Sequence, residues 1–409
     1  MTIVNTHVHV PPNFSAFTTP REAVRAAEAE KVRVLGVSNF YDQHVYSMIR
    51  DLTEGHGVVA EYGLEFITLV PDLEAGGIRI NDPANPGRMY LTGKGIDPFR
   101  DPTPRAAETT QRVRRGNDLR AGLMVEKVAA CFASAGFETG VDADRIIDEV
   151  ASRAGVPAEW VSLQERHIAR AFQEALDRVP LGKRVEILER AYGSEPAQDA
   201  DPASRVAPSK ADMDDPAAVQ AEIRSRLLKV GTPGFVPEVP LSIEDAYACI
   251  LDMGGIPCYP ILADGCDPLC PFEESPEALA EELLRRGIHA AELIPNRNHR
   301  DTVDEYVRTL TGAGLIVMAG TEHNTQDKIP LNPMCLDGEP TQNSRQAFFE
   351  ATCAVVAHAA RVRRGMDGYV DSSGRLVQDA EGVGRLVWEG QELIEGGSWL
   401  QPDGGGAAG

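Results

Sequence analysis

The first 70 residues alternate between short runs of β-branched residues and segments rich in helix-forming residues. The β-branched, period-two runs predict strands, whereas the segment that begins at Pro20 has the composition of a helix with proline in its first turn. Strand, helix, strand, helix, strand is the order typical of a parallel α/β domain, in which chemistry gathers at the carboxyl ends of the strands. The predicted elements are strands over 2–10, 32–38 and 61–70 and helices over 20–31 and 43–52.

Two histidines stand two positions apart in the first of these strands, in the run Asn5-Thr6-His7-Val8-His9-Val10. Side chains alternate across a strand, so His7 and His9 point to the same face. Neutral imidazole is the commonest protein ligand for zinc-like ions. The pattern therefore indicates half of a metal site. The alternative is an N-terminal strand with two incidental histidines, and only ligands from later in the chain decide between the two.

The middle of the chain changes character. From about residue 105 to 195 helical patterns follow one another, broken by glycine and proline. Residues 194–216 are polar, acidic and proline-bearing, which is typical of a mobile linker. The strand–helix alternation then resumes and continues to about residue 364. Helices are predicted over 119–135, 143–154, 157–176, 183–192, 242–253, 276–286, 301–314 and 344–364, and strands over 88–93, 256–262, 290–294 and 315–319.

These changes predict three parts. Residues 1–104 and 236–365 form an α/β barrel domain, and residues 105–235 form a helical insertion that includes the acidic linker. Residues 366–409 form a C-terminal extension with a small hairpin, a short helix and a flexible glycine-rich tail.

Charge and apolar content restrict the partners that we expect. There are 62 Asp and Glu against 40 Lys and Arg, a net charge of −22, and such a field repels nucleic acid and anionic membranes. No apolar run approaches the roughly 18 residues of a membrane span, and the N-terminus lacks a basic-then-apolar signal pattern. The seven cysteines lack paired spacing, which argues against a disulfide framework. We expect a cytoplasmic protein that acts on a small molecule and binds neither nucleic acid nor membranes; its oligomeric state stays open.

Several short motifs, in their order along the chain, resemble those of the polymerase and histidinol phosphatase (PHP) superfamily of metal-dependent phosphoesterases. The resemblance covers about residues 1–330 and is strongest to members with a helical insertion. It implies a distorted (β/α)7, TIM-like barrel with a metal cluster at the carboxyl ends of its strands. The matching motifs are His7-Val-His9 for His-x-His, Gly63-Leu-Glu65 for Gly-x-Glu, Glu165-Arg-His-Ile-Ala169 for Arg-Pro-His-Ile-Ala, Ala290-Ala-Glu292-Leu for Gly-x-Glu-Val, and Gly320-Thr-Glu-His-Asn324 for Gly-Ser-Asp-x-His.

The chain departs from the family at several ligand positions. Asn39 and Phe40 stand where the family has Asp-His, and Tyr90, Tyr259 and Asn324 stand where it has histidines. A phenol with a pKa near 10 is a poor ligand at neutral pH unless a metal lowers that pKa. The family's usual three-metal cluster is therefore not expected here.

Four donors remain, namely His7, His9, Glu65 and Glu322, with Glu322 in place of the family's Asp. Two imidazoles and two carboxylates suit one zinc, manganese or iron ion. His323 is an alternative to the lost closing histidine, although neighbouring side chains at a strand end usually point to opposite sides.

The resemblance implies a metal-dependent hydrolase. A phosphate ester is the family's substrate class, and the lost ligands leave other C–O or C–N hydrolysis open. We expect Glu65 or Asp264 to act as general base and Tyr90, Tyr259 or His323 to donate a proton. The predicted substrate-binding residues are Lys94, His167, Arg297 and Asn324.

Each of these assignments has a plainer alternative. Lys94 and Arg297 follow predicted strands and would hold a phosphate or carboxylate, but both are also compatible with ordinary solvated cations. Asp264 fits a turn as well as an active site, and His167 fits helix packing as well as catalysis. A different class of function is a metal-free, PHP-like pseudo-enzyme or small-molecule binding protein, in which no metal is bound.

Overall fold

The computed structural model describes residues 2–193, 212–377, 379–397 and 399. The chain divides into two compact units. The barrel unit comprises Met1–Val10, Pro20–Gln111 and Pro240–Gly409, and the helical unit comprises Pro11–Thr19 and Arg112–Val239. Each unit is described by itself.

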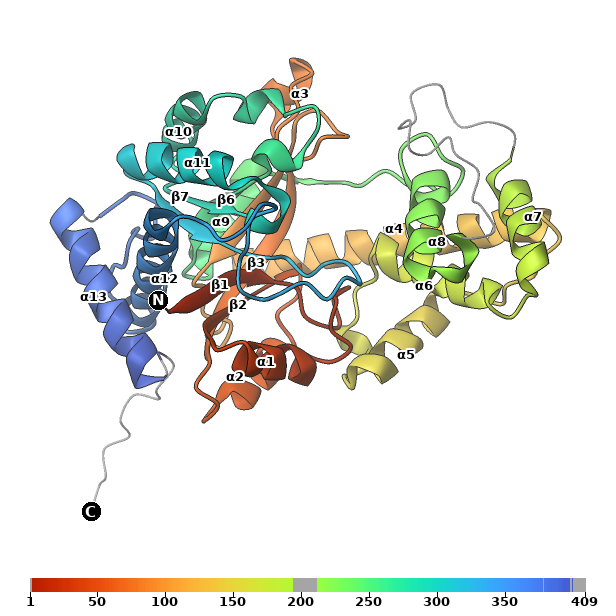
Figure 1. Cartoon of the computed structure of the whole chain (residues 1–409), viewed down its shortest axis with the longest axis horizontal. Coiled ribbons are helices and arrows are strands. Elements are labelled where there is room, and N and C mark those ends of the chain that lie inside the picture. Colours follow the sequence, from red (N-terminus) through yellow and green to blue (C-terminus); the bar gives the residue numbers. More distant parts are fainter. Residues whose placement is uncertain (1, 194–211, 378, 398, 400–409) are drawn as a thin grey trace. The chain divides into compact units, whose positions relative to one another are not determined.

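The barrel unit is built on a barrel-shaped sheet, which confirms the predicted α/β barrel fold (Figure 1). The first and last strands are nearly joined: Val8 bridges Glu322 in parallel, and the N–H groups of His9 and Glu322 donate across this gap to Glu322 O and His7 O, both at 2.8 Å. The strands, in spatial order, are β1 (Ile3–Val8), β2 (Val32–Phe40), β3 (Val59–Leu69), β4 (Arg88–Lys94), β6 (Ile256–Ile261), β7 (Ala290–Leu293) and β8 (Ile316–Ala319), with the two-residue β5 (Leu241–Ser242) beside β3.

β4 runs antiparallel to both of its neighbours, β3 and β6, whereas the strand–helix rhythm predicted a parallel sheet. A parallel connection needs a crossover, usually a helix that covers the sheet. Between β3 and β4 the chain has only the five-residue α3 (Pro71–Ala75), whose residues are exposed or half-buried. This segment is too short to form such a crossover helix, so the chain returns in the opposite direction.

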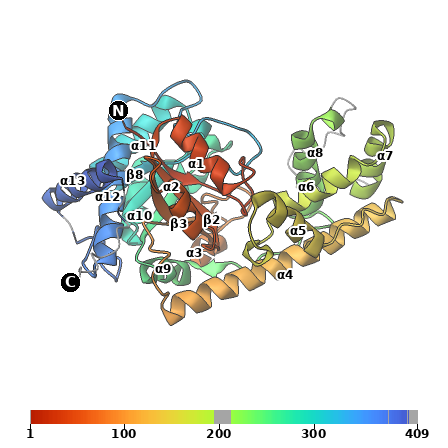
Figure 2. The same ribbon diagram turned by 90° about the horizontal axis from the view of Figure 1, so that it is seen from below.

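Amphipathic helices cover the sheet. In α1 (Pro20–Ala29), for example, Pro20, Ala23, Val24 and Ala27 are buried, as expected for one apolar stripe. Figure 2 shows α1 beside α2 (Tyr46–Thr53), and Figure 1 shows α10 beside α11. The other helices of the unit are α9 (Ile243–Asp252), α10 (Pro276–Arg285), α11 (Arg300–Gly312), α12 (Gln342–Arg363) and α13 (Ala380–Gly396).

The C-terminal part of this unit differs from the prediction of a short helix after residue 366. A bridge between Val370 and Leu376 supports the predicted hairpin, but α13 has 17 residues and packs against α12. The close approach requires a glycine, because a Cβ at Gly390 would lie 1.9 Å from the carbonyl oxygen of Cys353. The predicted glycine-rich tail at 403–409 lies outside the described residues.

The helical unit contains the predicted helices; the helix over 143–154 has the predicted limits, and the others have different ones. The helix expected over 119–135 is the second part of α4 (Pro104–Ser134), a single long helix that begins in the barrel unit (Figure 2). The helix expected over 157–176 is two elements, η1 (Ala158–Trp160) and α6 (Glu165–Leu176). The remaining elements are α5 (Ala143–Ala154), α7 (Leu181–Tyr192), η3 (Asp212–Asp214), α8 (Pro216–Ile223) and the π-helix η4 (Arg224–Leu228).

Most of the predicted linker, residues 194–211, lies outside the described residues, and the part that is described begins the helical elements η3 and α8. The helical unit has its own apolar core, in which Phe132 of α4 and Phe172 of α6 stack with ring centroids 5.3 Å apart. A unit with its own core is what the helical pattern between the two barrel segments predicts.

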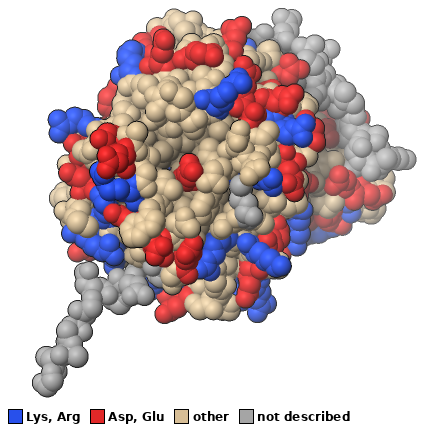
Figure 3. All heavy atoms as spheres, turned by 60° about the vertical axis from the view of Figure 1, so that its left-hand side comes forward, with Lys and Arg blue, Asp and Glu red and all other residues tan. Residues whose placement is uncertain are grey.

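Two features bear on the expected partners. Among the described residues, no helix is long and apolar enough to cross a membrane. On the face drawn in Figure 3, acidic and basic side chains lie beside one another around uncharged areas, so the net charge of −22 does not form a single acidic surface there.

Candidate metal centre

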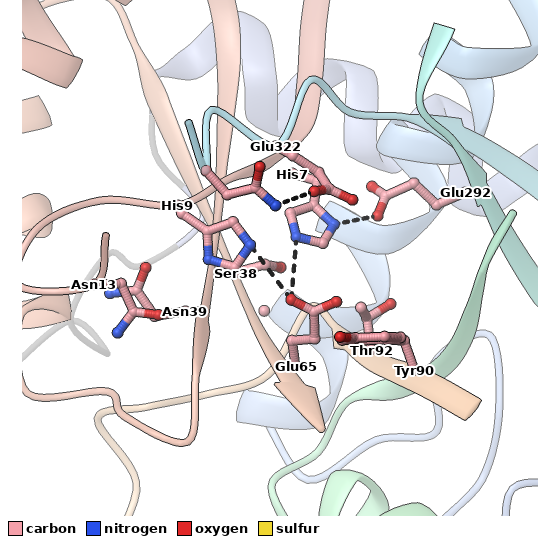
Figure 4. Close-up of polar contacts among 12 residues, drawn as sticks. His7, His9, Asn13, Ser38, Asn39, Glu65, Tyr90, Thr92, Glu292 and Glu322 are labelled. Atoms are coloured by element: carbon pink, nitrogen blue, oxygen red, sulfur yellow. Dashed lines mark hydrogen bonds and ion pairs between the residues drawn. The ribbon is translucent and has the colours of Figure 1, made fainter. Parts of the chain in front are cut away.

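Three buried side chains meet at one end of the barrel (Figure 4). His7 lies in β1, His9 directly follows it, and Glu65 lies in β3. Glu65 Oε2 is 3.3 Å from His9 Nε2 and 3.8 Å from His7 Nε2. Each residue offers one ligand atom, and these atoms all lie within 4.8 Å of one another. The two histidines and the carboxylate that the sequence assigned to one site therefore do come together.

The donor atoms at this point fit a divalent metal ion. Within the part of the chain that the structure describes, His7 Nε2 and Glu65 Oε2 are buried and make no hydrogen bond. Buried polar atoms are normally paired, so atoms of this kind call for a ligand or water. Two imidazoles and one carboxylate form a donor set that zinc, iron and manganese accept.

The far side of the His7 ring contacts a carboxylate. His7 Nδ1 lies 2.6 Å from Glu292 Oε2, and Glu292 Oε1 accepts hydrogen bonds from Thr6 Oγ1 at 2.5 Å and from Lys94 Nζ at 2.9 Å. Cys258 of β6 pairs with Thr92, which in turn pairs with Glu65 on the inner face of the sheet. Ala290 of β7 pairs with Cys258, so Glu292, two residues further along β7, also faces the barrel interior. Burial opposes ionisation of Glu292, but Lys94 and His7 lower its pKa to about 2.

Lys94 is fully buried, so the solvated-cation alternative does not hold for it. Besides Glu292, its ammonium group donates to Thr6 O at 2.7 Å and to Ser38 Oγ at 3.3 Å. Burial works against the charge, but the carboxylates of Glu292 and Glu61 raise the pKa of Lys94. Its predicted role in substrate binding stays a prediction, and its contacts are all internal to the barrel.

The fourth predicted ligand, Glu322, is engaged by a cation. Its Oε2 accepts from Arg297 Nη2 at 2.8 Å and also from Asn324 Nδ2. Burial would raise the pKa of Glu322, but Arg297 and then His7 lower it to about 2. Glu322 lies outside the group whose ligand atoms lie within 4.8 Å of one another, so its metal-binding role stays a prediction.

Arg297 is half-buried, and its charge interacts with Glu322 first and also with Glu65 and Tyr90, which together raise its pKa. Asn324 Oδ1 lies 3.4 Å from its Nη2. Arg297 and Asn324 are thus neighbours of the histidine–carboxylate group, as their predicted substrate role requires.

His323 has both ring nitrogens in contact with other groups. Nε2 donates to Ile329 O at 3.0 Å, and Nδ1 lies 2.8 Å from Thr321 Oγ1. Both ring nitrogens are therefore engaged by protein groups. Glu322 and His323 have φ angles of 60° and 52°, so the alternation of side chains along a strand does not apply to this pair. Burial lowers the pKa of His323. A role as proton donor stays a prediction that these contacts do not support.

Of the two tyrosines expected to donate a proton, only Tyr90 lies on the same face of the sheet as Glu65. Glu65 pairs with Thr92, so Tyr90, two residues away on the antiparallel β4, shares that inner face and lies beside Glu65 in Figure 4. Tyr259 is on the opposite face of its strand, because its neighbour Cys258 is the residue paired with Thr92. The expectation that Tyr259 faces the site is therefore wrong: the residue of β6 that faces inward at this level is Cys258, one position earlier.

The Tyr259 hydroxyl instead donates to the buried Glu273 at 2.7 Å. The Glu273 carboxylate also accepts the N–H groups of Leu262 and Ala263, and burial raises its pKa to about 7. This cluster holds the segment after β6. A catalytic role for Tyr259 stays a prediction without support from its contacts.

Two positions that the sequence resemblance matches to PHP ligands carry side chains with structural contacts. Asn39 exchanges two hydrogen bonds with the backbone of Val10, each at 3.0 Å. Phe40 stacks on His9 with centroids 5.0 Å apart and an interplanar angle of 18°. Both side chains fix the end of β1 where His9 lies.

Asp264 and His167 have other partners. Asp264 accepts hydrogen bonds from Asn298 and His299, both at 2.8 Å, and from Thr302 at 3.0 Å. Burial favours the neutral carboxyl group, but these hydrogen bonds outweigh burial and lower the pKa of Asp264. In the helical unit, His167 Nδ1 accepts the N–H of Gln164 at the start of α6, and burial lowers the pKa of His167 to about 3. His167 thus forms half of a capping box at the start of α6, and the proposed site roles of both residues stay predictions.

Sequence reasoning left Glu292 and Ser38 out of the site. The signal for Glu292 was present in the Ala290-Ala-Glu292-Leu motif, since a lone carboxylate within an apolar strand must find a partner. No comparable signal marks Ser38, whose contact with Lys94 depends on the pairing of strands.

No family model and no curated protein matches the chain. Among solved structures it is similar to a protein from Bifidobacterium adolescentis assigned by inference as a metal-dependent phosphoesterase, with 14% identity and a TM-score of 0.55 over 86% of this chain and 96% of the other. An amidohydrolase from Chromobacterium violaceum, solved with bound sulfate and no metal, has 16% identity and a TM-score of 0.49 over 85% of this chain and 97% of the other. The first similarity shows a shared fold.

Proposed function

We propose that this chain is a metal-dependent hydrolase whose centre holds one metal ion, bound by His7, His9 and Glu65, in place of the three-metal cluster of the PHP family. The observation that carries the proposal is the buried meeting of these three side chains, with His7 Nε2 and Glu65 Oε2 lacking hydrogen bonds among the described residues. The likeness in fold to a protein assigned as a metal-dependent phosphoesterase supports a phosphate ester as the substrate class.

When bound, a divalent ion would supply a Lewis acid that polarises a substrate oxygen and lowers the pKa of a water molecule. The chain's own residues would do the rest. Arg297, half-buried beside Glu322, would receive the anionic group of the substrate by a charge-assisted hydrogen bond. Tyr90, on the inner face of β4, would donate a proton to the leaving oxygen. Glu322 stays a predicted fourth ligand.

A second candidate is a metal-free binding protein on the same fold. The observation that favours it is that Asn39, Phe40 and Glu322 all serve protein contacts at positions where the family holds metal. In that case the buried imidazoles would bind a small anionic ligand directly.

Metal analysis separates the two. The purified protein, prepared without a metal-affinity tag and incubated with zinc, manganese or iron, should retain about one ion per chain after gel filtration, as expected for a single site of two imidazoles and a carboxylate. The His7→Ala/His9→Ala variant should retain none. The matched control is His44→Ala/His56→Ala, which removes two half-exposed histidines from the same unit and should behave as the wild type. A wild type that retains no ion would exclude the hydrolase proposal in favour of the binding protein.

A further inference from the structure

We propose that Glu292 is the positioning residue of this metal centre: it holds the His7 ring so that Nε2, and not Nδ1, is presented to the ion. The inference rests on the proposed function for the ion, but the orientation of His7 is a property of the protein alone. The 2.6 Å contact between His7 Nδ1 and Glu292 Oε2 carries it. An ionised carboxylate only accepts hydrogen bonds, so Nδ1 must carry a proton, and in the neutral ring, the form that binds a metal, the lone pair then lies on Nε2.

Glu292 is itself held on its other oxygen. Glu292 Oε1 accepts from Lys94 Nζ and from Thr6 Oγ1, and all of these groups are fully buried. Lys94 is anchored in turn by Thr6 O and Ser38 Oγ. Side chains from four strands, β1, β2, β4 and β7, therefore join to fix one carboxylate behind one imidazole.

The energetics favour a functional reason for this arrangement. A buried ion pair is often no more stable than an apolar pair of the same shape, because removing two charges from water costs as much as their attraction returns. Stability alone therefore gives little reason to place Lys94 and Glu292 at the centre of the barrel. A metal-binding histidine, by contrast, gains orientation and basicity from a carboxylate on its other nitrogen, typically worth 10- to 100-fold in metal affinity.

The plain alternative is that Glu292 exists to neutralise Lys94. Two variants distinguish these roles. Glu292→Gln keeps the shape and an acceptor oxygen but removes the charge. Glu292→Leu/Lys94→Met removes both charges together, so no unpaired charge is left buried. The matched control is Glu273→Gln, which changes another buried carboxylate of the same unit that lies on the outer side of β6, bound to Tyr259.

Two measurements are made on the full chain. The first is the dissociation constant for Zn²⁺ from competition with a chromophoric chelator. We expect it to rise about tenfold in Glu292→Gln and up to about 100-fold in the double variant, and to stay unchanged in Glu273→Gln. The second is the tautomer of His7 in metal-free protein, read from ¹⁵N shifts of the ring. In the wild type, the proton of the neutral His7 ring should be on Nδ1. In Glu292→Leu/Lys94→Met, which lacks the carboxylate acceptor, it should not be held there.

The outcomes are separable. A Zn²⁺ dissociation constant that stays within about twofold of the wild type in a folded Glu292 variant overturns the inference. If the wild type binds no Zn²⁺, the proposed function fails, and the tautomer decides the inference by itself: a wild-type His7 with its proton on Nε2 overturns it. That last measurement needs no variant, so it stands even if a substitution prevents folding.

Discussion

Asn39 and Val10 form a two-way clamp: Asn39 Oδ1 accepts the N–H of Val10, and Asn39 Nδ2 donates to Val10 O, each at 3.0 Å. Asn39, which the sequence resemblance matches to an Asp of the PHP family, thus ties β2 to the residue after His9. An amide can make both bonds, whereas a carboxylate makes only the first.

These two hydrogen bonds predict the effect of an aspartate at position 39. Asn39→Asp should lower the free energy of unfolding by about 1–3 kcal/mol, because a buried carboxylate would face Val10 O without a proton to donate. Urea unfolding measures this. A variant as stable as the wild type that also bound a second ion would show that the clamp is dispensable.

Metal binding should stabilise the folded chain. At a free Zn²⁺ concentration of 100 times the dissociation constant, the gain in free energy of unfolding is about 2.7 kcal/mol. Thermal melts with Zn²⁺ and with a chelator should therefore differ for the wild type and coincide for Glu65→Gln. Equal melting temperatures of the wild type under both conditions would argue against the centre.

Tyr90→Phe and Tyr259→Phe should have different effects. Loss of the Tyr259 hydroxyl leaves the buried Glu273 without one donor and should cost about 1–3 kcal/mol of stability. Tyr90→Phe should reduce phosphatase turnover on an aryl phosphate in a variant that a thermal melt shows to be folded. If Tyr90→Phe turns over at the full rate, Tyr90 is not the proton donor.

Arg297 is expected to bind the anionic group of the substrate. Arg297→Met should weaken inhibition by inorganic phosphate at least tenfold, since a charge-assisted hydrogen bond is worth about 1.5–3 kcal/mol. The comparison is Arg50→Met, which changes an exposed arginine of the same unit that pairs with Asp51. Phosphate inhibition that is equal in both variants would remove Arg297 from the site.

Stability should fall with acidification in part through His358. This buried imidazole donates from Nε2 to Gly254 O and accepts the N–H of Tyr369 on Nδ1, and burial lowers its pKa from 6.5 to about 4. Above pH 6.5 the ring is neutral in both states. Between pH 6.5 and 4 the unfolded chain binds a proton that the folded chain does not, so stability is lost as the pH falls.

From pH 7 to pH 5 this single residue should cost about 2 kcal/mol. His358→Gln should be less stable than the wild type at pH 7 but lose about that much less on going to pH 5. Urea titrations at both pH values measure the difference. Parallel losses in the two proteins would mean that His358 does not carry this part of the acid sensitivity.

Local pattern was enough for much of the fold and for the heart of the site. Periods of two and 3.6 residues, with Pro20 at a helix start, placed most strands and helices to within a few residues, because those periods report which face of an element is apolar. His7 and His9 could be joined in advance because alternation along one strand is a local property, and Glu65 was added by its motif.

The tertiary structure decided what depends on pairing between distant strands. The pairing of β4 with β3 sets which residues of β4 face inward. The pairing of β4 with β6 places Cys258 opposite Thr92, so the next residue, Tyr259, points outward to Glu273. His7 and Glu292 stand 285 positions apart, so no local period links them. A lysine and a glutamate within apolar strands need partners when they are buried, but only the closed sheet brings Lys94 and Glu292 together and sets that pair behind His7.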